Sequence, residues 1–135
     1  MSGVLLTDDI AVEGCSPPDG VIAVWTLNRP EKLNALNRDS HLAIKEQCVR
    51  VESDDAVRAV VIRGAAPPMP EEGKRSKPAA FAAGADISEF AGKNSDDVRE
   101  FFANNAWESV WGLSKPTIAM VDGFALGGGT ELALA

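Results

Sequence analysis

Apolar residues in this chain fall in short runs separated by amphipathic stretches, and the two patterns predict different elements. The β-branched and aromatic run at 21–27 and the near-continuous apolar run at 59–62 each predict a strand. Between them the spacing i, i+4, i+7 predicts a helix from Asn37 or Ser40 to about Glu52, with a buried face of Ile44, Cys48 and Val51. The run at 59–62 is typical of a strand buried on both faces of a parallel sheet, so this βαβ-like unit favours an α/β fold.

The N-terminal segment supplies a partner for the strand at 21–27. Apolar residues at 4–6 and 10–12 favour extended structure, and the sequence S-P-P-D-G at 16–20 is a turn signal. We therefore expect a hairpin in this part of the chain, without catalytic chemistry of its own.

The C-terminal half predicts two further strands and two further helices. Short apolar runs at 80–82 and 117–121 predict strands, the second of them buried. A single helix should begin at Ser95 and end before Lys115-Pro116, because acidic residues follow its cap and proline stops it. Its predicted core stripe comprises Val98, Phe102, Ala106 and Val110, widened by Phe101, Trp107 and Trp111.

Composition bounds the classes of function. At 135 residues with 45% apolar content the chain has the size of one globular domain, and its net charge of −7 argues against nucleic acid or an anionic membrane as the main partner. No apolar run reaches the length of a membrane span, and the acidic N-terminus is unlike a signal or transit peptide, so we expect a cytoplasmic location. Cys15 and Cys48 form no disulfide framework, and the single histidine, His41, argues against a histidine triad or a metal site.

Three consecutive glycines, Gly127 to Gly129, separate the strand at 117–121 from an Ala/Leu-rich segment that favours a helix. Such a turn can aim free backbone N–H groups at a ligand, where they stabilise negative charge that develops on an oxygen. Glu131 is the one ionisable side chain in that helical segment, and it could face the same ligand. By itself, however, the pattern is more often that of an ordinary turn followed by a helix cap.

Three motifs in order make the pattern specific. They are Leu27-Asn28-Arg29-Pro30-Glu31-Lys32-Leu33-Asn34-Ala35-Leu36-Asn37, Phe81-Ala82-Ala83-Gly84-Ala85-Asp86, and Gly123-Phe124-Ala125-Leu126-Gly127-Gly128-Gly129-Thr130-Glu131-Leu132-Ala133. Together they resemble the enoyl-CoA hydratase/isomerase (crotonase) family, from about Val21 to Ala135. The resemblance implies the N-terminal part of a single crotonase-like domain, an α/β fold built as a ββα spiral.

The resemblance also implies roles for particular residues. The N–H groups of Ala85 and Gly128 would form an oxyanion hole for a thioester enolate, and Glu131 would be one of two catalytic carboxylates. Substrate would further contact Arg29, Lys32, Ala83, Gly84, Asp86, Ile87, Phe102 and Gly127. No metal or separate cofactor is implied, since coenzyme A is part of the substrate. For Arg29 and Lys32 an ordinary solvated loop is an equal alternative, and for the helix at 95–115 the plainer alternative is core packing.

The implied reaction is addition of water across the double bond of a 2-enoyl-CoA, or the reverse dehydration of a 3-hydroxyacyl-CoA. Isomerisation, dehalogenation and decarboxylation remain alternatives, because the same oxyanion hole serves any enolate. A different alternative is a non-catalytic half-domain that binds CoA or associates with full-length subunits. A complete member of the family would be a trimer-based homo-oligomer.

Two segments depart from the family pattern. The stretch at 64–78 is long and rich in proline and charge, which predicts a mobile surface loop; its cations Lys74, Arg75 and Lys77 are solvated or touch the CoA 3′-phosphate. The chain also stops at Ala135 inside a helical pattern without a stop signal, ahead of the family's second carboxylate. We expect a truncated hydratase that is weakly active or inactive alone.

Overall fold

The computed structural model describes residues 3–14, 19–103 and 105–135. Cys15 and most of the turn predicted at 16–20 lie outside these ranges. The strands are β1 Leu5–Val12, β2 Gly20–Leu27, β3 Val57–Gly64, β4 Ala80–Ala82, β5 Thr117–Met120 and β6 Phe124–Ala125. The α-helices are α1 Arg38–Ser53, α2 Ser95–Ala103, α3 Trp107–Trp111 and α4 Gly128–Leu134, with 3-10 turns η1 Pro30–Lys32 and η2 Ile87–Phe90.

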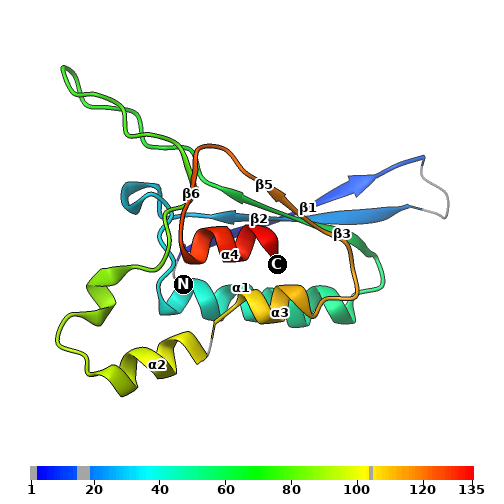
Figure 1. Ribbon diagram of the computed structural model, residues 1–135. Helices are drawn as coiled ribbons and strands as arrows, with labels where there is room; N and C mark the ends of the chain where they lie inside the picture. Colours follow the sequence, from blue (N-terminus) through cyan, green and yellow to red (C-terminus); the bar gives the residue numbers. More distant parts are fainter. Residues whose placement is uncertain (1–2, 15–18, 104) are drawn as a thin grey trace.

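The main sheet has the strand order β1-β2-β3-β5. β1 and β2 pair antiparallel as the predicted hairpin, whereas β2, β3 and β5 are parallel. Helices α1 and α3 lie together below the sheet (Figure 1), and α4 contacts α3 and the strands β4, β5 and β6. The predicted α/β class is therefore confirmed, with β3 as a central strand of the parallel part.

Helix α1 follows from its sequence. Asn37 is its N-cap, and its side chain accepts the Ser40 N–H at 2.9 Å. The buried face contains Ile44, Cys48 and Val51, as the spacing predicted, together with Ser40 and His41. Burial, and secondarily Glu52, raises the pKa of the Cys48 thiol to about 11, so this cysteine is an inert core residue.

The single helix predicted from Ser95 to before Lys115 is wrong, because the structure contains two helices, α2 and α3, that are separated after Ala103. Asn105 caps the second helix by accepting the Glu108 N–H at 3.2 Å, and the Ala106 N–H is taken by a side chain of α1. The predicted stripe is divided accordingly. Ala106 and Val110 are buried, whereas Phe102 and Trp111 are largely exposed.

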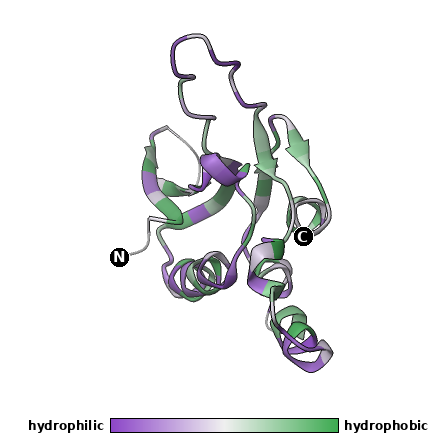
Figure 2. Ribbon diagram, turned by 90° about the vertical axis from the view of Figure 1, so that its left-hand side faces the viewer, coloured by the Kyte–Doolittle hydropathy of each residue, from purple (hydrophilic) through white to green (hydrophobic). Residues whose placement is uncertain are grey.

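The strand predicted at 117–121 forms, as β5, but it is not buried on both faces. Successive side chains of a strand point to opposite faces of the sheet, and in β5 they alternate between a partly covered face and an open one. Ile118 is 55% exposed and Met120 is 51% exposed. The run from β5 to β6, close to the C-terminus label, is coloured mainly as hydrophobic (Figure 2).

The short strands β4 and β6 form a second, parallel sheet that the local pattern predicted only in part. β4 was expected, but β6 is two residues long and exists because Phe124 N–H and Leu126 N–H donate to Ala79 O and Ala82 O. This pairing lays the glycine turn alongside the loop that follows β4. It thereby brings the second and third sequence motifs together.

The proline-rich segment at 65–79 projects away from the rest of the chain as an exposed loop (Figure 1). Its two ends are joined by one side chain, since Asn34 Nδ2 donates to Ala65 O at 3.0 Å and to Ala80 O at 2.7 Å. Lys77 Nζ reaches back to Glu31 O, and Lys74 pairs with Glu71. No helix in the described residues is long and apolar enough to cross a membrane.

Candidate active site

The three glycines at the start of α4 serve separate purposes. Gly127 has φ 48° and ψ −123°, a conformation that side chains disfavour, and it turns the chain into the helix. Gly129 permits close packing, because a Cβ there would lie 2.0 Å from Ala82 O. Helix α4 is thus held against β4 by backbone contact, and only glycine at position 129 allows it.

The loop after β4 presents one face to Leu36 and the opposite face to the glycine turn. Leu36 N–H donates to Gly84 O, and Asp86 N–H donates to Leu36 O, both at 2.8 Å. In this parallel bridge the intervening residue, Ala85, directs its own N–H and C=O to the other side. The glycine turn lies there, since a Cβ added to Gly84 would be 3.8 Å from Gly128 N.

The N–H groups of Ala85 and Gly128 are therefore neighbours. A Cβ added to Gly128 would lie 3.8 Å from Ala85 N. No hydrogen-bond acceptor in residues 3–14, 19–103 and 105–135 pairs with either N–H. Two adjacent backbone donors without an intramolecular partner can both bind one oxygen atom of a ligand.

Glu131 lies in the first turn of α4, three residues after Gly128, and its side chain is exposed. Residues three apart share a helix face, and the Cα–Cβ bond tilts toward the N-terminus of the helix. The Glu131 carboxylate therefore belongs to the same face as the Gly128 N–H.

Arg29 and Asp86 form an ion pair next to the loop, with Nη2 and Oδ2 at 2.7 Å and both side chains mostly buried. Arg29 Nη1 also donates to Ala35 O at 2.7 Å. Asp86 caps η2 by accepting the Ser88 N–H and the Ser88 hydroxyl. The Ser88 hydroxyl, and after it the Arg29 guanidinium, lowers the pKa of Asp86 to about 2.

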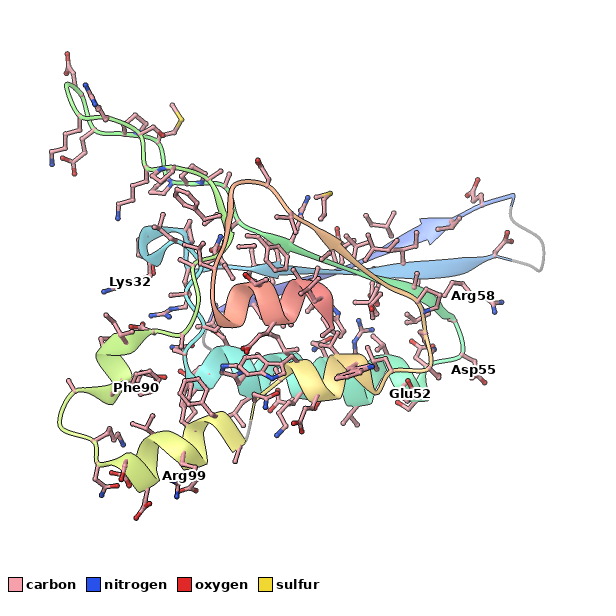
Figure 3. All side chains as sticks on the ribbon, in the orientation of Figure 1. Lys32, Glu52, Asp55, Arg58, Phe90 and Arg99 are labelled. Carbon is pink, nitrogen blue, oxygen red and sulfur yellow. The ribbon has the colours of Figure 1, made fainter. Side chains whose placement is uncertain are left out.

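These contacts bear on the residues expected to bind substrate. Both terminal nitrogens of Arg29 are engaged within the chain, so we infer that Arg29 fixes the loop rather than holding a phosphate. Lys32, by contrast, is exposed and points away from the body (Figure 3). Ile87 is 81% exposed although it is apolar, and Ala83 N–H is used by Leu33 O.

Aromatic side chains, which we call the aromatic wall, begin at the glycine turn with Trp107 and include Phe101, Phe102 and Phe90. A Cβ on Gly128 would be 3.3 Å from Cζ3 of Trp107, so the indole packs directly against this glycine. Phe102 packs on Phe101 and on Phe90, which extends from η2 toward α2 (Figure 3). Between α1 and α2 a hollow of about 490 Å³ is lined by apolar and charged residues: Arg38, His41, Leu42, Lys45, Glu89, Phe90, Lys93, Asp97, Glu100 and Phe101.

Two residues that organise the site were not predicted. Asn34 is buried with φ 54°, and its Oδ1 accepts the Arg29 N–H at 3.0 Å while its amide holds the ends of the 65–79 loop. Its only local signal was that asparagine tolerates the left-handed region. His41 is buried on the α1 face that contains Ile44 and Cys48, and its spacing of three and seven residues from them was the signal that could have placed it there. Within the described residues no cluster of side chains is suited to a metal ion.

Known proteins resemble this chain in sequence and in fold. Residues 18–135 match the family model described as enoyl-CoA hydratase/isomerase. The chain is 42% identical over 118 residues to a short-chain-enoyl-CoA hydratase of Clostridium acetobutylicum, which covers 86% of this chain and 41% of the relative. It is 40% identical to a crotonyl-CoA hydratase of Syntrophomonas wolfei, over 84% of this chain and 40% of that protein.

Among solved structures, the enoyl-CoA hydratase of Bacillus anthracis superimposes with a TM-score of 0.76 at 29% identity, covering 97% of this chain and 44% of that one. The crotonase-like fold expected from the motifs is thus confirmed, and the chain spans about 40% of the length of the curated relatives it matches. On its sequence, its fold and the match over residues 18–135, the chain belongs to the enoyl-CoA hydratase/isomerase family.

Proposed function

We propose that this chain forms the thioester-binding part of an enoyl-CoA hydratase site. The observation that carries the proposal is the pair of neighbouring N–H groups, Ala85 and Gly128, that lack an acceptor in the described residues. The names of the two curated relatives, a short-chain-enoyl-CoA hydratase and a crotonyl-CoA hydratase, support a 2-enoyl-CoA as substrate.

The chemistry that these donors would support is addition of water to an enoyl thioester. The water oxygen bonds to Cβ, and the electron pair of the double bond moves through Cα onto the thioester oxygen. When that pair returns, Cα takes up one proton, which balances the proton that the water loses to the carboxylate. The two N–H groups stabilise the oxygen as it becomes an enolate, and loss of one such donor costs roughly 10²–10³ in rate in acyl transfer. Glu131, on the face of Gly128, orients the water and accepts its proton.

The rest of the substrate would follow the exposed residues around this pair. Gly84 and Gly127 leave room for the thioester against the backbone, and Ile87 offers an apolar surface for the adenine. Lys32 supplies the cation for a CoA phosphate, a contact that should weaken with salt. The acyl chain would run along the aromatic wall at Trp107 and Phe102.

The test combines binding with turnover. Crotonyl-CoA is added to the ¹⁵N-labelled chain, and we expect the amide resonances of Ala85 and Gly128 to shift most.

Turnover is followed as the loss of the enone absorbance, and we expect it to be slow or absent in the chain alone. Any turnover should fall by about 10²–10⁴ in Glu131→Gln. The matched control Glu108→Gln, an exposed glutamate in the first turn of α3, should leave binding and turnover unchanged. Saturating crotonyl-CoA that moves neither amide would reject the proposal.

A second candidate, a half-domain that associates with complete subunits, is favoured by the exposed apolar residues of β5, β6 and α4. Its test is co-sedimentation of the chain with an intact enoyl-CoA hydratase. A stoichiometric complex without an amide shift at Ala85 and Gly128 would support this candidate over the first.

A further inference from the structure

His41 connects α1 to the two elements that flank the break between α2 and α3. Its Nδ1 accepts the Ala106 N–H at 3.0 Å, a donor that would otherwise lack a partner where α2 has already ended. An acceptor at Nδ1 requires the neutral imidazole with its proton on Nε2. The side chain therefore replaces a backbone carbonyl at this break.

The same ring packs on both sides of the break. The His41 centroid lies 5.3 Å from that of Phe101, at the end of α2, with an interplanar angle of 88°. It also lies 5.3 Å from the Trp107 centroid, at the start of α3, with an angle of 73°. Edge-on aromatic contacts of this kind orient rings as well as burying them. One buried side chain thus fixes the place and tilt of the Trp107 indole.

Trp107 in turn is the side chain that packs against Gly128. A Cβ on Gly128 would meet its Cζ3 at 3.3 Å and its Cη2 at 3.6 Å. The indole therefore limits how Gly128 and its N–H can move and forms the wall next to the two donors. A small displacement of this ring changes the space beside the Gly128 N–H.

We propose that His41 is a positioning residue of the thioester site: it holds Trp107 against Gly128 through the Ala106 hydrogen bond and the edge-on contact. The part that concerns substrate rests on the proposed function, whereas the part that concerns Trp107 does not. No catalytic role is assigned to the imidazole itself, since its contacts are to Ala106, Phe101 and Trp107.

The arrangement depends on a neutral imidazole. Burial, and after it the charge of Lys45, lowers the pKa of His41 to about 4. Protonation would turn Nδ1 into a donor that faces the Ala106 N–H, so the contact should be lost below that pH. Other charged groups surround the hollow that His41 lines, and they come from α1, η2, the following loop and α2: Arg38, Lys45, Glu89, Lys93, Asp97 and Glu100.

The experiment uses the chain labelled with 5-fluorotryptophan, because ¹⁹F resonances report the three indoles separately. Trp107→Phe assigns the Trp107 signal. Trp25, fully buried, reports the core, and Trp111, 78% exposed, reports the exposed face of α3. His41→Phe keeps a ring but removes the acceptor, and His41→Asn places an acceptor at the position of Nδ1.

We expect His41→Phe to move or broaden the Trp107 resonance while the Trp25 resonance stays in place. In His41→Asn the Trp107 resonance should lie closer to its wild-type position than in His41→Phe. In the wild type the Trp107 resonance should titrate with a midpoint near pH 4, and neither variant should show this step. Crotonyl-CoA should bind about tenfold more weakly to His41→Phe, the factor that corresponds to roughly 1.4 kcal/mol.

A Trp107 resonance that is the same in His41→Phe and the wild type would overturn the proposal. So would a titration step that survives both substitutions. If His41→Phe fails to fold, seen as loss of the Trp25 resonance, His41→Asn provides the test, because it must abolish the titration step at Trp107 while the carboxylates around the hollow are unchanged. If crotonyl-CoA moves no resonance of the wild type, the proposed function fails. The role of His41 in holding Trp107 is then tested separately, by the Trp107 resonance measured without ligand in the wild type and the two variants.

Discussion

At the scale of single residues, the site depends on polar side chains that hold backbone in place. For Arg29 a phosphate contact and an ordinary loop position were equal alternatives, and its guanidinium lies between Asp86 and Ala35 O, next to the loop that carries Ala85. Asp86 uses its other oxygen to cap η2 through Ser88. A charged pair that is mostly buried and hydrogen-bonded within the chain orients a loop better than it binds a solvated ligand.

This pair should make stability depend on pH in the acid range. The folded pKa of Asp86, about 2, lies below its ordinary value of 3.8, so its contribution is complete above the ordinary value and is lost as the pH falls toward 2. We expect Asp86→Asn to reduce the free energy of unfolding at pH 7 by about 1–3 kcal/mol, as for hydrogen bonds to charged groups.

Urea unfolding between pH 7 and pH 2 measures this difference. The gap between wild type and Asp86→Asn should close between pH 4 and pH 2, whereas Asp122→Asn, at an exposed position, should track the wild type throughout. A gap of constant size over this range would show that ionisation of Asp86 is not what stabilises the loop.

At the scale of elements, the segments that form the candidate site are joined by short pairings and single contacts, unlike the long strands of the main sheet. β4 and β6 are three and two residues long, and α4 reaches β4 only because Gly129 has no side chain. Asn34 ties η1 to the end of β3 and the start of β4. The 65–79 loop can therefore be long without separating the strands that it connects.

Asn34→Asp should destabilise the fold strongly. The carboxylate cannot donate to Ala65 O and Ala80 O, and its charge would be buried between two carbonyl oxygens. We expect a loss of about 2–5 kcal/mol in the free energy of unfolding, measured with urea. Asn28→Asp makes the same chemical change at an exposed position, where Nδ2 contacts Gly3 O. Equal losses in the two variants would contradict the role assigned to Asn34.

At the scale of the whole molecule, one side of the fold is apolar and open. It comprises Ile118, Met120, Val121, Phe124, Leu126 and Leu134, each close to half exposed or more. Monomeric proteins rarely leave a large contiguous apolar patch in water, and among the described residues no strand pairs with the outer edge of β5. We infer that this side contacts protein rather than water.

The chain should therefore associate with itself as its concentration rises. Sedimentation velocity over a dilution series should show the sedimentation coefficient increasing with concentration, and Met120→Lys should suppress the increase. Val49→Lys introduces the same charge at a 73% exposed apolar position on α1 and should change nothing. A monomer at every concentration would count against this use of the face.

Much of the fold could be predicted from the sequence because many of its elements depend on residues that are close together in the chain. The β-branched runs, the Asn37 cap and the spacing of Ile44, Cys48 and Val51 each depend on neighbours within a few residues. The motifs around Ala85, Gly128 and Glu131 likewise carried the family resemblance. The predictions that failed depend on contacts between distant parts of the chain. The single helix predicted from Ser95 is interrupted where His41 of α1 binds the Ala106 N–H, and the strand predicted as buried, β5, lies at the end of the main sheet.

The sequence by itself thus determined the strands other than β6, the first helix, the small residues of the two loops and the acidic side chain near them, because propensity and spacing are properties of short segments. Only the tertiary structure decided that Ala85 and Gly128 are neighbours, that Arg29 is bound to Asp86, and that Asn34 and His41 hold the site. These are contacts between residues far apart in the chain, and they arise when hydrophobic burial folds the segments onto one another.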